Sequence, residues 1–433
     1  MDNLKHYIIR FLLGDACLHE ASALIGYTSN EEEFHKYKLI ILPSHFFDTS
    51  VYGSSNSIPQ LPLNTLEDIP LLFGSPKIEL INDRLIVHAD IIASSYFLLS
   101  RYEEFVRKDI RDKYGRFPGK ESLPFRAGFI DRPLVDEYGS LLRKWLREVG
   151  IDIPEPKLAI NKIYLTHDVD VPYFYKGRIK SALKGFLTTN KQKTILRSFF
   201  GRPENDPAFT FPWLIKKDQS LQKLVGKEAC ETIYFFKSGG KTHEDNPVYN
   251  LDSKEIQYLF SLCKKEGATI GLHASFEAGI NPTLIPSEKI RLEKATNSVI
   301  NYNRHHYLNC REPEDMQQLI DANISDDFTM GYADVSGFRL GTCRPVNWIN
   351  PADKSVNELI LHPLTIMECS LDRPEYMGLN YESALAYSKK IIDQTLKSNG
   401  DLVLLWHNSN VAGTQNMYAA LYENLLIYIR KCL

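Results

Sequence analysis

Two acidic residues with a histidine just before them follow an apolar run near the middle of the chain. The segment Ile163–Asp170 reads Ile-Tyr-Leu-Thr-His-Asp-Val-Asp. An apolar run that ends in polar residues is typical of a buried strand reaching the edge of a sheet or barrel, where parallel α/β folds keep their chemistry. In an extended strand Asp168 and Asp170 point to the same side, so one could bind a metal while the other moves a proton. Taken alone, the segment favours two solvated acids at a strand-to-loop turn.

Polar residues recur where the later strand candidates end. These segments are His273–Glu277, Arg304–Tyr307, Asp326-Asp327, Gly337–Thr342 and Trp406–Ser409. A single histidine at a strand end is usually only hydrogen-bonded, but parallel strands bring their carboxyl ends to one rim. We therefore expect these side chains to lie together, and we expect His243 and His362, outside the segments, to be surface or packing residues.

The composition bounds the class of protein. The chain has 433 residues, of which 43% are apolar and 24% charged, with a net charge of −3. These values predict a well-packed soluble protein and argue against a generic nucleic-acid binder. The seven cysteines form no CxxC pair, the N-terminus does not begin as a signal peptide, and no apolar stretch reaches the length of a membrane span. We expect a cytoplasmic protein.

The order of the predicted elements divides the chain in two. Residues 1–155 predict a small accessory unit that ends in a proline-stiffened linker. From residue 156 strands alternate with helices, which predicts parallel strands with crossover helices. The strand candidates are 160–166, 231–236, 268–272, 300–304, 325–329, 359–367 and 401–406. The helix candidates are 212–226, 252–266, 286–299, 312–322, 381–398 and 414–431. Seven strands suit a barrel and a doubly wound sheet about equally well.

The segment Thr166–Asp170 resembles the first motif of the polysaccharide deacetylase superfamily, the NodB-like carbohydrate esterases. The resemblance covers residues 160–433. His273 matches the first ligand of the family's second metal-binding motif, but Glu277 stands where the family has the second histidine. Arg304–Tyr307 and the stretch Phe97–Glu104 are similar to a bacterial subfamily with a distinct N-terminal domain.

The resemblance implies a fold and a set of roles. The fold would be α/β, a distorted (β/α) barrel of about seven strands preceded by a smaller α/β N-terminal domain. Asp168 would be the base, and Asp170 and His273 would bind a divalent metal, with zinc expected. His306 is favoured as the third ligand, and Glu277 is the alternative. The resemblance further assigns Arg339 to orienting the base, Asp327 to supporting the acid, and His407 to the general acid.

The implied activity is metal-dependent removal of an N-acetyl group from an N-acetylated sugar or glycan precursor. Two alternatives stay open. Glu277 at an expected histidine position favours a catalytically inactive carbohydrate-binding or glycan-assembly module on the same fold. A metal-independent amidohydrolase is the second alternative.

A basic insertion at 171–202 interrupts the alternation of strands and helices. It contains no Asp or Glu, and its basic residues are Lys176, Arg178, Lys180, Lys184, Lys191, Lys193, Arg197 and Arg202. One interpretation is a solvated helical excursion packed on the barrel, which we favour somewhat. The other is a contact for an anionic or lipid-linked substrate, or for a membrane surface.

Overall fold

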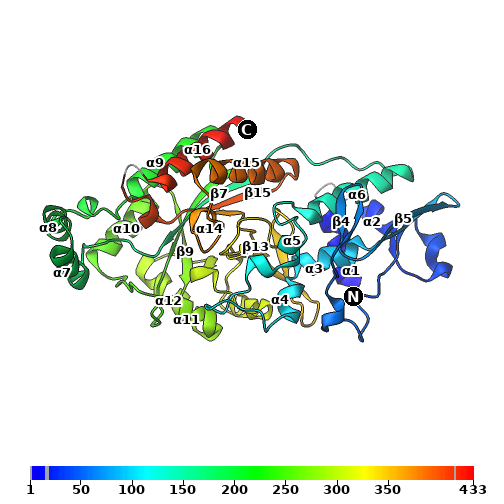
Figure 1. The fold of residues 1–433 in the computed structure, drawn as a ribbon, viewed down its shortest axis with the longest axis horizontal. Coiled ribbons are helices and arrows are strands. Elements are labelled where there is room, and N and C mark those ends of the chain that lie inside the picture. Colours follow the sequence, from blue (N-terminus) through cyan, green and yellow to red (C-terminus); the bar gives the residue numbers. More distant parts are fainter. Residues whose placement is uncertain (1, 15–18, 414–415) are drawn as a thin grey trace.

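The computed structural model describes residues 2–14, 19–413 and 416–433. Figure 1 shows an elongated molecule with a small sheet at one end and a larger one beside it. In the described part of the chain, the small sheet has the order β1-β2-β6-β5 and the large sheet the order β12-β13-β11-β10-β9-β8-β7-β15-β14. A short hairpin of β3 and β4 completes the strands.

The first 150 residues build the small sheet and the helices around it. Its strands are β1 (Ile25–Tyr27), β2 (Leu39–Ile41), β5 (Gly74–Ile81) and β6 (Arg84–Ala89), with β3 (Asn64–Leu66) and β4 (Ile69–Leu71) nearby. The helices are α1 (Asp2–Leu13), α2 (His19–Ala23), α3 (Ile91–Leu99), α4 (Tyr102–Val106), α5 (Leu123–Arg126) and α6 (Leu134–Glu148). β1, β2 and β6 pair in parallel, and β5 and β6 form an antiparallel hairpin.

The large sheet is parallel at every pair except β12 with β13. Its strands are β7 (Lys162–Val169), β8 (Cys230–Phe236), β9 (Thr269–Ala274), β10 (Tyr302–His305), β11 (Asp326–Asp327), β12 (Val346–Ile349), β13 (Val356–Leu361), β14 (Ile366–Met367) and β15 (Asp401–Leu405). The central strands are buried along nearly their whole length, as parallel strands covered by helices are. The sheet curls into a half barrel. The α/β class is therefore confirmed, whereas a barrel of about seven strands is not.

Helices connect these strands and cover the sheet. They are α7 (Ile179–Thr188), α8 (Gln192–Phe200), α9 (Phe211–Val225), α10 (Lys254–Lys265), α11 (Phe276–Ile280), α12 (Ile285–Thr296), α13 (Gln317–Asp321), α14 (Glu368–Asp372), α15 (Tyr381–Lys397) and α16 (Met417–Cys432). Polar caps fix where several begin: the side chains of Ser253, Asn380 and Asn416 accept from the backbone N–H three residues on. The last helix was predicted to begin at residue 414, but residues 414 and 415 lie outside the described residues. In the described part α16 begins at Met417.

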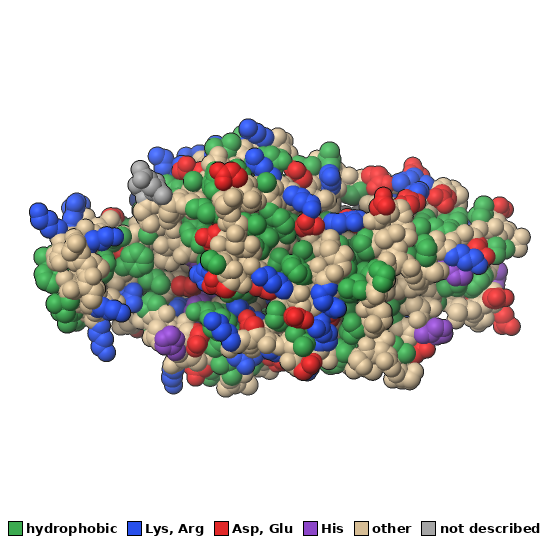
Figure 2. All heavy atoms as spheres, viewed as in Figure 1, with side chains coloured by type: hydrophobic (Ala, Val, Ile, Leu, Met, Phe, Trp, Pro, Cys, Tyr) green, Lys and Arg blue, Asp and Glu red, His purple; other side chains and the backbone are tan. Residues whose placement is uncertain are grey.

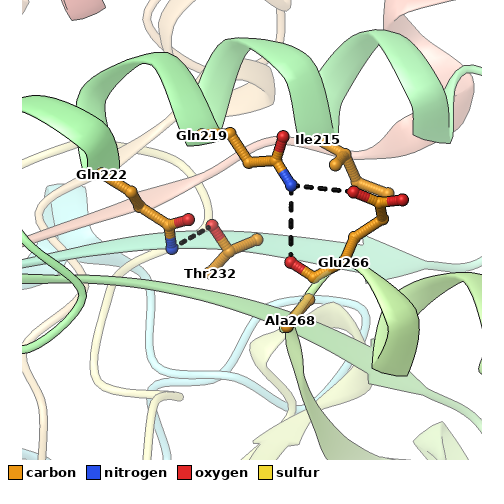
Figure 3. A pocket seen from close by; sticks show the side chains of 7 residues that line it. Ile215, Gln219, Gln222, Thr232, Glu266 and Ala268 are labelled. Carbon is orange, nitrogen blue, oxygen red and sulfur yellow. Dashed lines mark hydrogen bonds between the residues drawn. The ribbon is translucent and has the colours of Figure 1, made fainter.

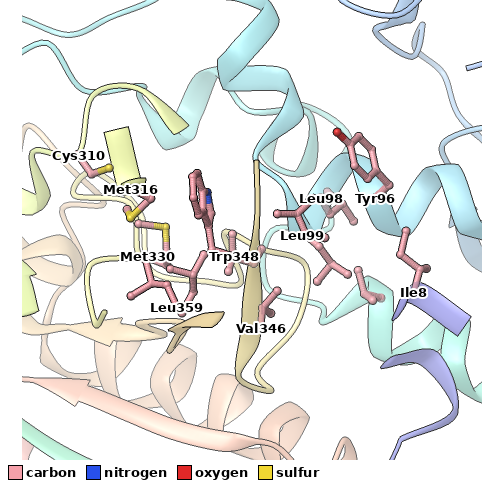
Figure 4. Close-up of a cluster of buried hydrophobic side chains, with 14 of the residues drawn as sticks. Ile8, Tyr96, Leu98, Leu99, Cys310, Met316, Met330, Val346, Trp348 and Leu359 are labelled. Atoms are coloured by element: carbon pink, nitrogen blue, oxygen red, sulfur yellow. The ribbon is translucent and has the colours of Figure 1, made fainter. Parts of the chain in front are cut away.

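One hydrophobic cluster joins the two parts of the chain. Ile8, Tyr96 and Leu99 from the N-terminal helices belong to the same buried cluster as Trp348 and Leu359 from the large sheet (Figure 4). The N-terminal helices thus pack directly on the large sheet. The domain boundary near residue 155 stays a prediction.

The helices and the cysteines bear on the predictions about membrane and compartment. None of the helices in residues 2–14, 19–413 and 416–433 combines the length and apolarity needed to cross a bilayer. The six described cysteines, Cys230, Cys263, Cys310, Cys343, Cys369 and Cys432, are free thiols, and Cys17 lies outside the described residues. The cytoplasmic location stays a prediction.

Candidate active site and metal centre

Five strands of the large sheet deliver polar side chains to one edge. Asp168, His273 and Arg304 lie near the ends of β7, β9 and β10. Asp170, His306, Glu368 and His407 follow within two residues of the ends of β7, β10, β14 and β15. These strands run parallel, so their carboxyl ends meet at the same rim. The residues described below lie together at this rim.

Asp170, His273 and His306 form a tight group of three. Each offers one ligand atom, and the three atoms lie within 4.8 Å of one another. Oδ1 of Asp170 is 3.2 Å from Nε2 of His273 and 3.4 Å from Nε2 of His306. Both histidines are almost fully buried. These are the three residues that the motif resemblance implies for a metal, with His306 as the favoured third ligand.

The hydrogen bonds of His273 indicate that its Nε2 is a ligand atom. Nδ1 lies 2.8 Å from the carbonyl oxygen of Arg304, which can only accept, so Nδ1 carries the proton and Nε2 presents a lone pair. That lone pair faces Oδ1 of Asp170, which is also an acceptor, and both atoms are buried without a hydrogen-bond partner. Two buried acceptors that face each other are costly unless a cation lies between them. The residues therefore fit a divalent metal.

A second carboxylate supports His306 from behind. Nδ1 of His306 is 3.4 Å from Oδ1 of Asp245, a fully buried residue in the loop after β8. Asp245 also accepts from the backbone N–H groups of Phe276 and Glu277. Carboxylates in this position fix the orientation and tautomer of metal-binding histidines. Sequence reasoning missed Asp245, because its loop has no periodic pattern.

The charges around Asp170 favour its ionised form. Burial raises the pKa of Asp170, but the charges of His306 and His407 outweigh burial and hold that pKa well below its ordinary value. Burial likewise raises the pKa of Asp245, and hydrogen bonds from His306 and its other partners bring it down to about 2. Both carboxylates are thus ionised near neutral pH, as a metal ligand and its support must be.

Asp168 lies beside the triad and is oriented by Arg304. Oδ1 of Asp168 accepts a 3.0 Å hydrogen bond from Arg304 Nη1, which also donates to Oγ1 of Thr166 at 2.7 Å. The other oxygen, Oδ2, is 3.6 Å from Nε2 of His273. Arg304 is completely buried. One carboxylate oxygen is therefore fixed by the arginine, and the other faces the triad.

Arg339 does not hold Asp168, contrary to the role that the sequence gave it. Its guanidinium donates two hydrogen bonds to the carboxylate of Glu104, at 2.9 and 2.7 Å, and a third to the carbonyl of Gly331. Glu104 comes from α4 in the first half of the chain and also binds Arg101. Arg339 thus takes part in a buried ion-pair network between the two halves, and Arg304 occupies the place predicted for it.

His407 is the candidate acid, and its partner is Glu368. Nδ1 of His407 donates to Oε1 of Glu368 at 2.7 Å, and its Nε2 is 3.6 Å from Oδ2 of Asp170. Burial lowers the pKa of His407, but Glu368 and Cys369 outweigh it and raise that pKa well above its ordinary value. Glu368 is fully buried and also accepts from Asn410. The arrangement holds a charged imidazole at the edge of the metal site.

Asp327 does not support His407, which corrects a second predicted role. Its carboxylate accepts from the side chains of Asn303 and Thr329, at 2.8 and 2.7 Å. Oδ1 of Asp327 is 4.0 Å from Nδ1 of His305, so it belongs to a polar group beneath β10 and β11. Glu368, which sequence reasoning missed, takes the predicted place of Asp327. The sequence signal that could have found Glu368 is its position directly after the apolar strand candidate 359–367.

Glu277, the alternative third ligand, does not join the metal triad among the described residues. It lies in the first turn of α11, and its backbone N–H donates to Asp245 at 3.2 Å. His306 therefore completes the group.

An open pocket lies over the site. It encloses about 550 Å³, solvent space included, and Asp168, Asp170, His306 and His407 line it. Arg116 lines it from the first half of the chain, anchored by a 2.8 Å hydrogen bond to the carbonyl of Tyr307. The other lining residues are Tyr307, Leu308, Ala333, Met367, Cys369, Arg373, Tyr376 and Leu405. The pocket therefore opens Asp168, Asp170, His306 and His407 toward solvent.

A smaller pocket between α9 and the sheet has no comparable chemistry. There Gln219 donates to Glu266, and Gln222 donates to Thr232 (Figure 3). Its polar groups bind one another rather than pointing into free space. The candidate site is therefore the pocket at the strand ends.

Comparison with known proteins finds a family model for the first part of the chain and a distantly similar structure. Residues 3–150 match a family of unknown function, DUF7033. A solved structure entitled "Crystal structure of putative polysaccharide deacetylase from Mycobacterium smegmatis" is similar with a TM-score of 0.39 and 12% identity, over 64% of this chain and 86% of that one. No curated protein matches the sequence. A likeness of this degree supports no conclusion about function, which we infer from the site.

Proposed function

We propose that this protein is a metal-dependent hydrolase that removes an N-acetyl group from an N-acetylated sugar. The observation that carries the proposal is the metal-ready group of Asp170, His273 and His306, set beside Asp168 and His407 in an open pocket. Hydrolysis of an amide needs a strong nucleophile, a site for the oxyanion and a proton for the leaving nitrogen. In this site Asp168 could activate a water as the nucleophile, and His407 could supply the proton for the leaving nitrogen.

Two histidines and one carboxylate are a ligand set that zinc accepts, with one position left open for catalysis. When bound there, the ion would supply Lewis acidity toward water and toward the amide carbonyl. Asp245 would keep His306 in the tautomer that presents Nε2 to the ion.

Asp168 has the position of a general base. Arg304 fixes one of its oxygens, so the other is aimed at the space in front of the triad. From there it can accept a proton from an attacking water. The buried guanidinium also pairs with the negative charge of Asp168 and fixes the direction of its free oxygen.

His407 has the position of a general acid. Glu368 keeps its imidazole charged, and Nε2 points toward the metal site from the side opposite to Nδ1. A protonated imidazole in that place can give its proton to the departing amine. Base and acid therefore come from β7 and β15, which are neighbouring strands.

The sugar part of the proposal is supported by the pocket lining and by the motif resemblance at Thr166–Asp170. Tyr307 and Tyr376 provide rings at the pocket, and Arg116 and Arg373 provide hydrogen-bond donors. Aromatic faces and donors together suit the apolar and hydroxyl-bearing faces of a sugar ring.

The test is metal analysis of the purified full-length protein, paired with acetate release from N-acetylhexosamine oligosaccharides. We expect one divalent ion per chain, zinc being the expected metal, and acetate release that stops on chelation and returns when the metal is restored. A stoichiometric ion without release from any N-acylated sugar would favour the inactive sugar-binding module. Release that survives complete chelation would favour the metal-independent amidohydrolase.

A further inference from the structure

The basic insertion forms a projecting helical hairpin that is firmly anchored at its base. α7 and α8 stand at the end of the molecule opposite the small sheet (Figure 1). The Asp206 carboxylate accepts from the backbone N–H groups of residues 174–176, at 2.8 to 2.9 Å. Nζ of Lys176 donates to the carbonyls of Phe199 and Gly201, at 3.3 and 2.7 Å. The hairpin is therefore held in a defined orientation.

The outer face of this hairpin exposes large apolar side chains. Six of the twenty large apolar residues that are exposed in the described part of the chain lie between residues 179 and 200. They are Ile179, Leu183, Phe186, Leu187, Leu196 and Phe200, and the exposed fractions of Ile179, Leu187 and Phe200 are 71%, 74% and 77%. Their spacing of three or four residues places them along one face of each helix. Single exposed apolar residues are normal on a protein surface, but a cluster of them on one face indicates an interaction site. The apolar face is therefore not explained by a hairpin that contacts only solvent.

Basic side chains border the apolar face. Lys180 and Lys184 follow Ile179 and Leu183 along α7, and the other exposed basic residues are Lys191, Lys193, Arg197 and Arg202. None of these six forms an ion pair within the described residues, and no acid occurs between residues 171 and 202. The next acid, Glu204, accepts a hydrogen bond from the Tyr258 hydroxyl, which lowers its pKa, and Arg202 lowers it further. Figure 2 shows basic and apolar side chains together at this end of the molecule.

We propose that the outer face of the α7–α8 hairpin docks on a lipid bilayer that carries anionic headgroups. A helix face with Phe, Leu and Ile beside Lys and Arg is the pattern that inserts its apolar side between headgroups, while its cations bind phosphates. The uncompensated positive charge selects an anionic bilayer over a neutral one. This surface is separate from the metal centre, so the proposal goes beyond the proposed hydrolase and does not rest on it.

The experiment is co-sedimentation of the full-length protein with vesicles of phosphatidylcholine, or of an equal mixture of phosphatidylcholine and phosphatidylglycerol. We expect binding to the mixed vesicles that weakens as salt is raised, and at least 10-fold weaker binding to neutral ones. The pair Lys180→Glu and Lys184→Glu should weaken binding to mixed vesicles by about 30-fold or more, since each basic group near an anionic surface contributes about fivefold. The pair Leu183→Ser and Leu187→Ser should weaken it by at least about 10-fold.

Matched controls separate docking from general surface effects. Lys223→Glu with Lys265→Glu changes the net charge equally, on α9 and α10. Leu80→Ser with Ile81→Ser removes two exposed apolar side chains from β5, at the other end of the molecule. Both control pairs should bind as the unaltered protein does, and circular dichroism and metal content should match for all variants.

Three results would overturn the proposal. The first is no sedimentation of the unaltered protein with mixed vesicles. The second is binding that neither hairpin pair changes. The third is a dimer in sedimentation velocity that Leu183→Ser with Leu187→Ser converts to a monomer while vesicles bind neither form, because the face would then cover a second copy of the chain.

Discussion

Arg304 donates a 3.0 Å hydrogen bond to Asp168, although two strands separate β10 from β7 in the sheet. In a flat sheet these strands would stand about 14 Å apart. The contact closes because the sheet curls, which turns the side chains of both strands toward the same interior. The position of the candidate base is therefore set by the curvature of the sheet.

Replacing Asp168 by Asn should remove turnover and leave the metal in place. The amide keeps the shape of the carboxylate but cannot take a proton from water, so we expect kcat to fall by about 10²- to 10⁴-fold. Metal analysis and acetate release on the same sample check this outcome. Full metal together with full turnover would remove Asp168 from the role of base.

Substitution of the three grouped residues should abolish metal binding. Asp170→Ala, His273→Ala and His306→Ala each remove one ligand atom from the group. Glu277→Gln is the matched control, since Glu277 is outside the group, and it should keep a full complement of metal. Loss of the ion in Glu277→Gln, with retention in His306→Ala, would reverse the assignment of the third ligand.

Replacing Glu368 by Gln should shift the pH dependence of the reaction. His407 acts as an acid only while charged, so activity is present below its pKa and is lost as pH rises through it. Burial lowers the pKa of His407 and Glu368 raises it above its ordinary value, so removing the carboxylate leaves burial to lower it. We expect the alkaline limb of kcat/KM to move down by at least about 1 pH unit.

Asp327→Asn is the control for this shift. Asp327 is bound to Asn303 and Thr329, so its replacement should leave the alkaline limb where it is. A shift in Asp327→Asn that Glu368→Gln does not show would restore the role that the sequence gave to Asp327.

Replacing Glu104 by Gln should destabilise the fold without touching the metal site. The change leaves Arg101 and Arg339 buried without their shared carboxylate, which costs about 3 to 5 kcal/mol in the free energy of unfolding. Glu121→Gln is the control, because its partly exposed pair with Arg107 contributes at most about 1 kcal/mol. Urea unfolding at neutral pH measures both.

The ion pairs of Glu104 with Arg101 and Arg339 also predict how the stability of the fold changes at low pH. Burial raises the pKa of Glu104, but Arg101 and Arg339 lower it from 4.5 to about 2. A depressed pKa stabilises the fold above the ordinary value, and this stabilisation is lost as pH falls from about 4.5 toward 2. The Glu104→Gln variant should therefore lose less stability than the unaltered protein over that range. If both proteins lose the same free energy of unfolding over that range, groups other than Glu104 cause the acid sensitivity.

That Asp170, His273 and His306 lie at one rim could be predicted because each follows a clear strand candidate, whereas their choice as a metal-binding set came from the motif resemblance. The alternation of strands and helices predicts parallel strands, and parallel strands bring such ends to one rim whatever the details of the sheet. The α/β class follows from the same alternation. These are local patterns combined with one general rule of topology.

The partners of these residues depend on long-range geometry that local patterns do not contain. Arg304 lies in β10 and Arg339 in the loop between β11 and β12, and local patterns do not show which of the two reaches Asp168. Glu368 was hidden because the strand candidate 359–367 is two strands, β13 and β14, at different places in the sheet. Pro363 inside that run is the signal that would have divided it.

Arg116 lines the pocket although it precedes the large sheet by more than forty residues in the chain. One wall of the pocket is therefore supplied by a segment that holds none of the three grouped residues. Relatives that keep the sheet but exchange their first 150 residues would offer a differently shaped entrance to the same reactive groups. The proposed function therefore predicts that swapping that segment between homologues changes which substrate is accepted while the reaction stays the same.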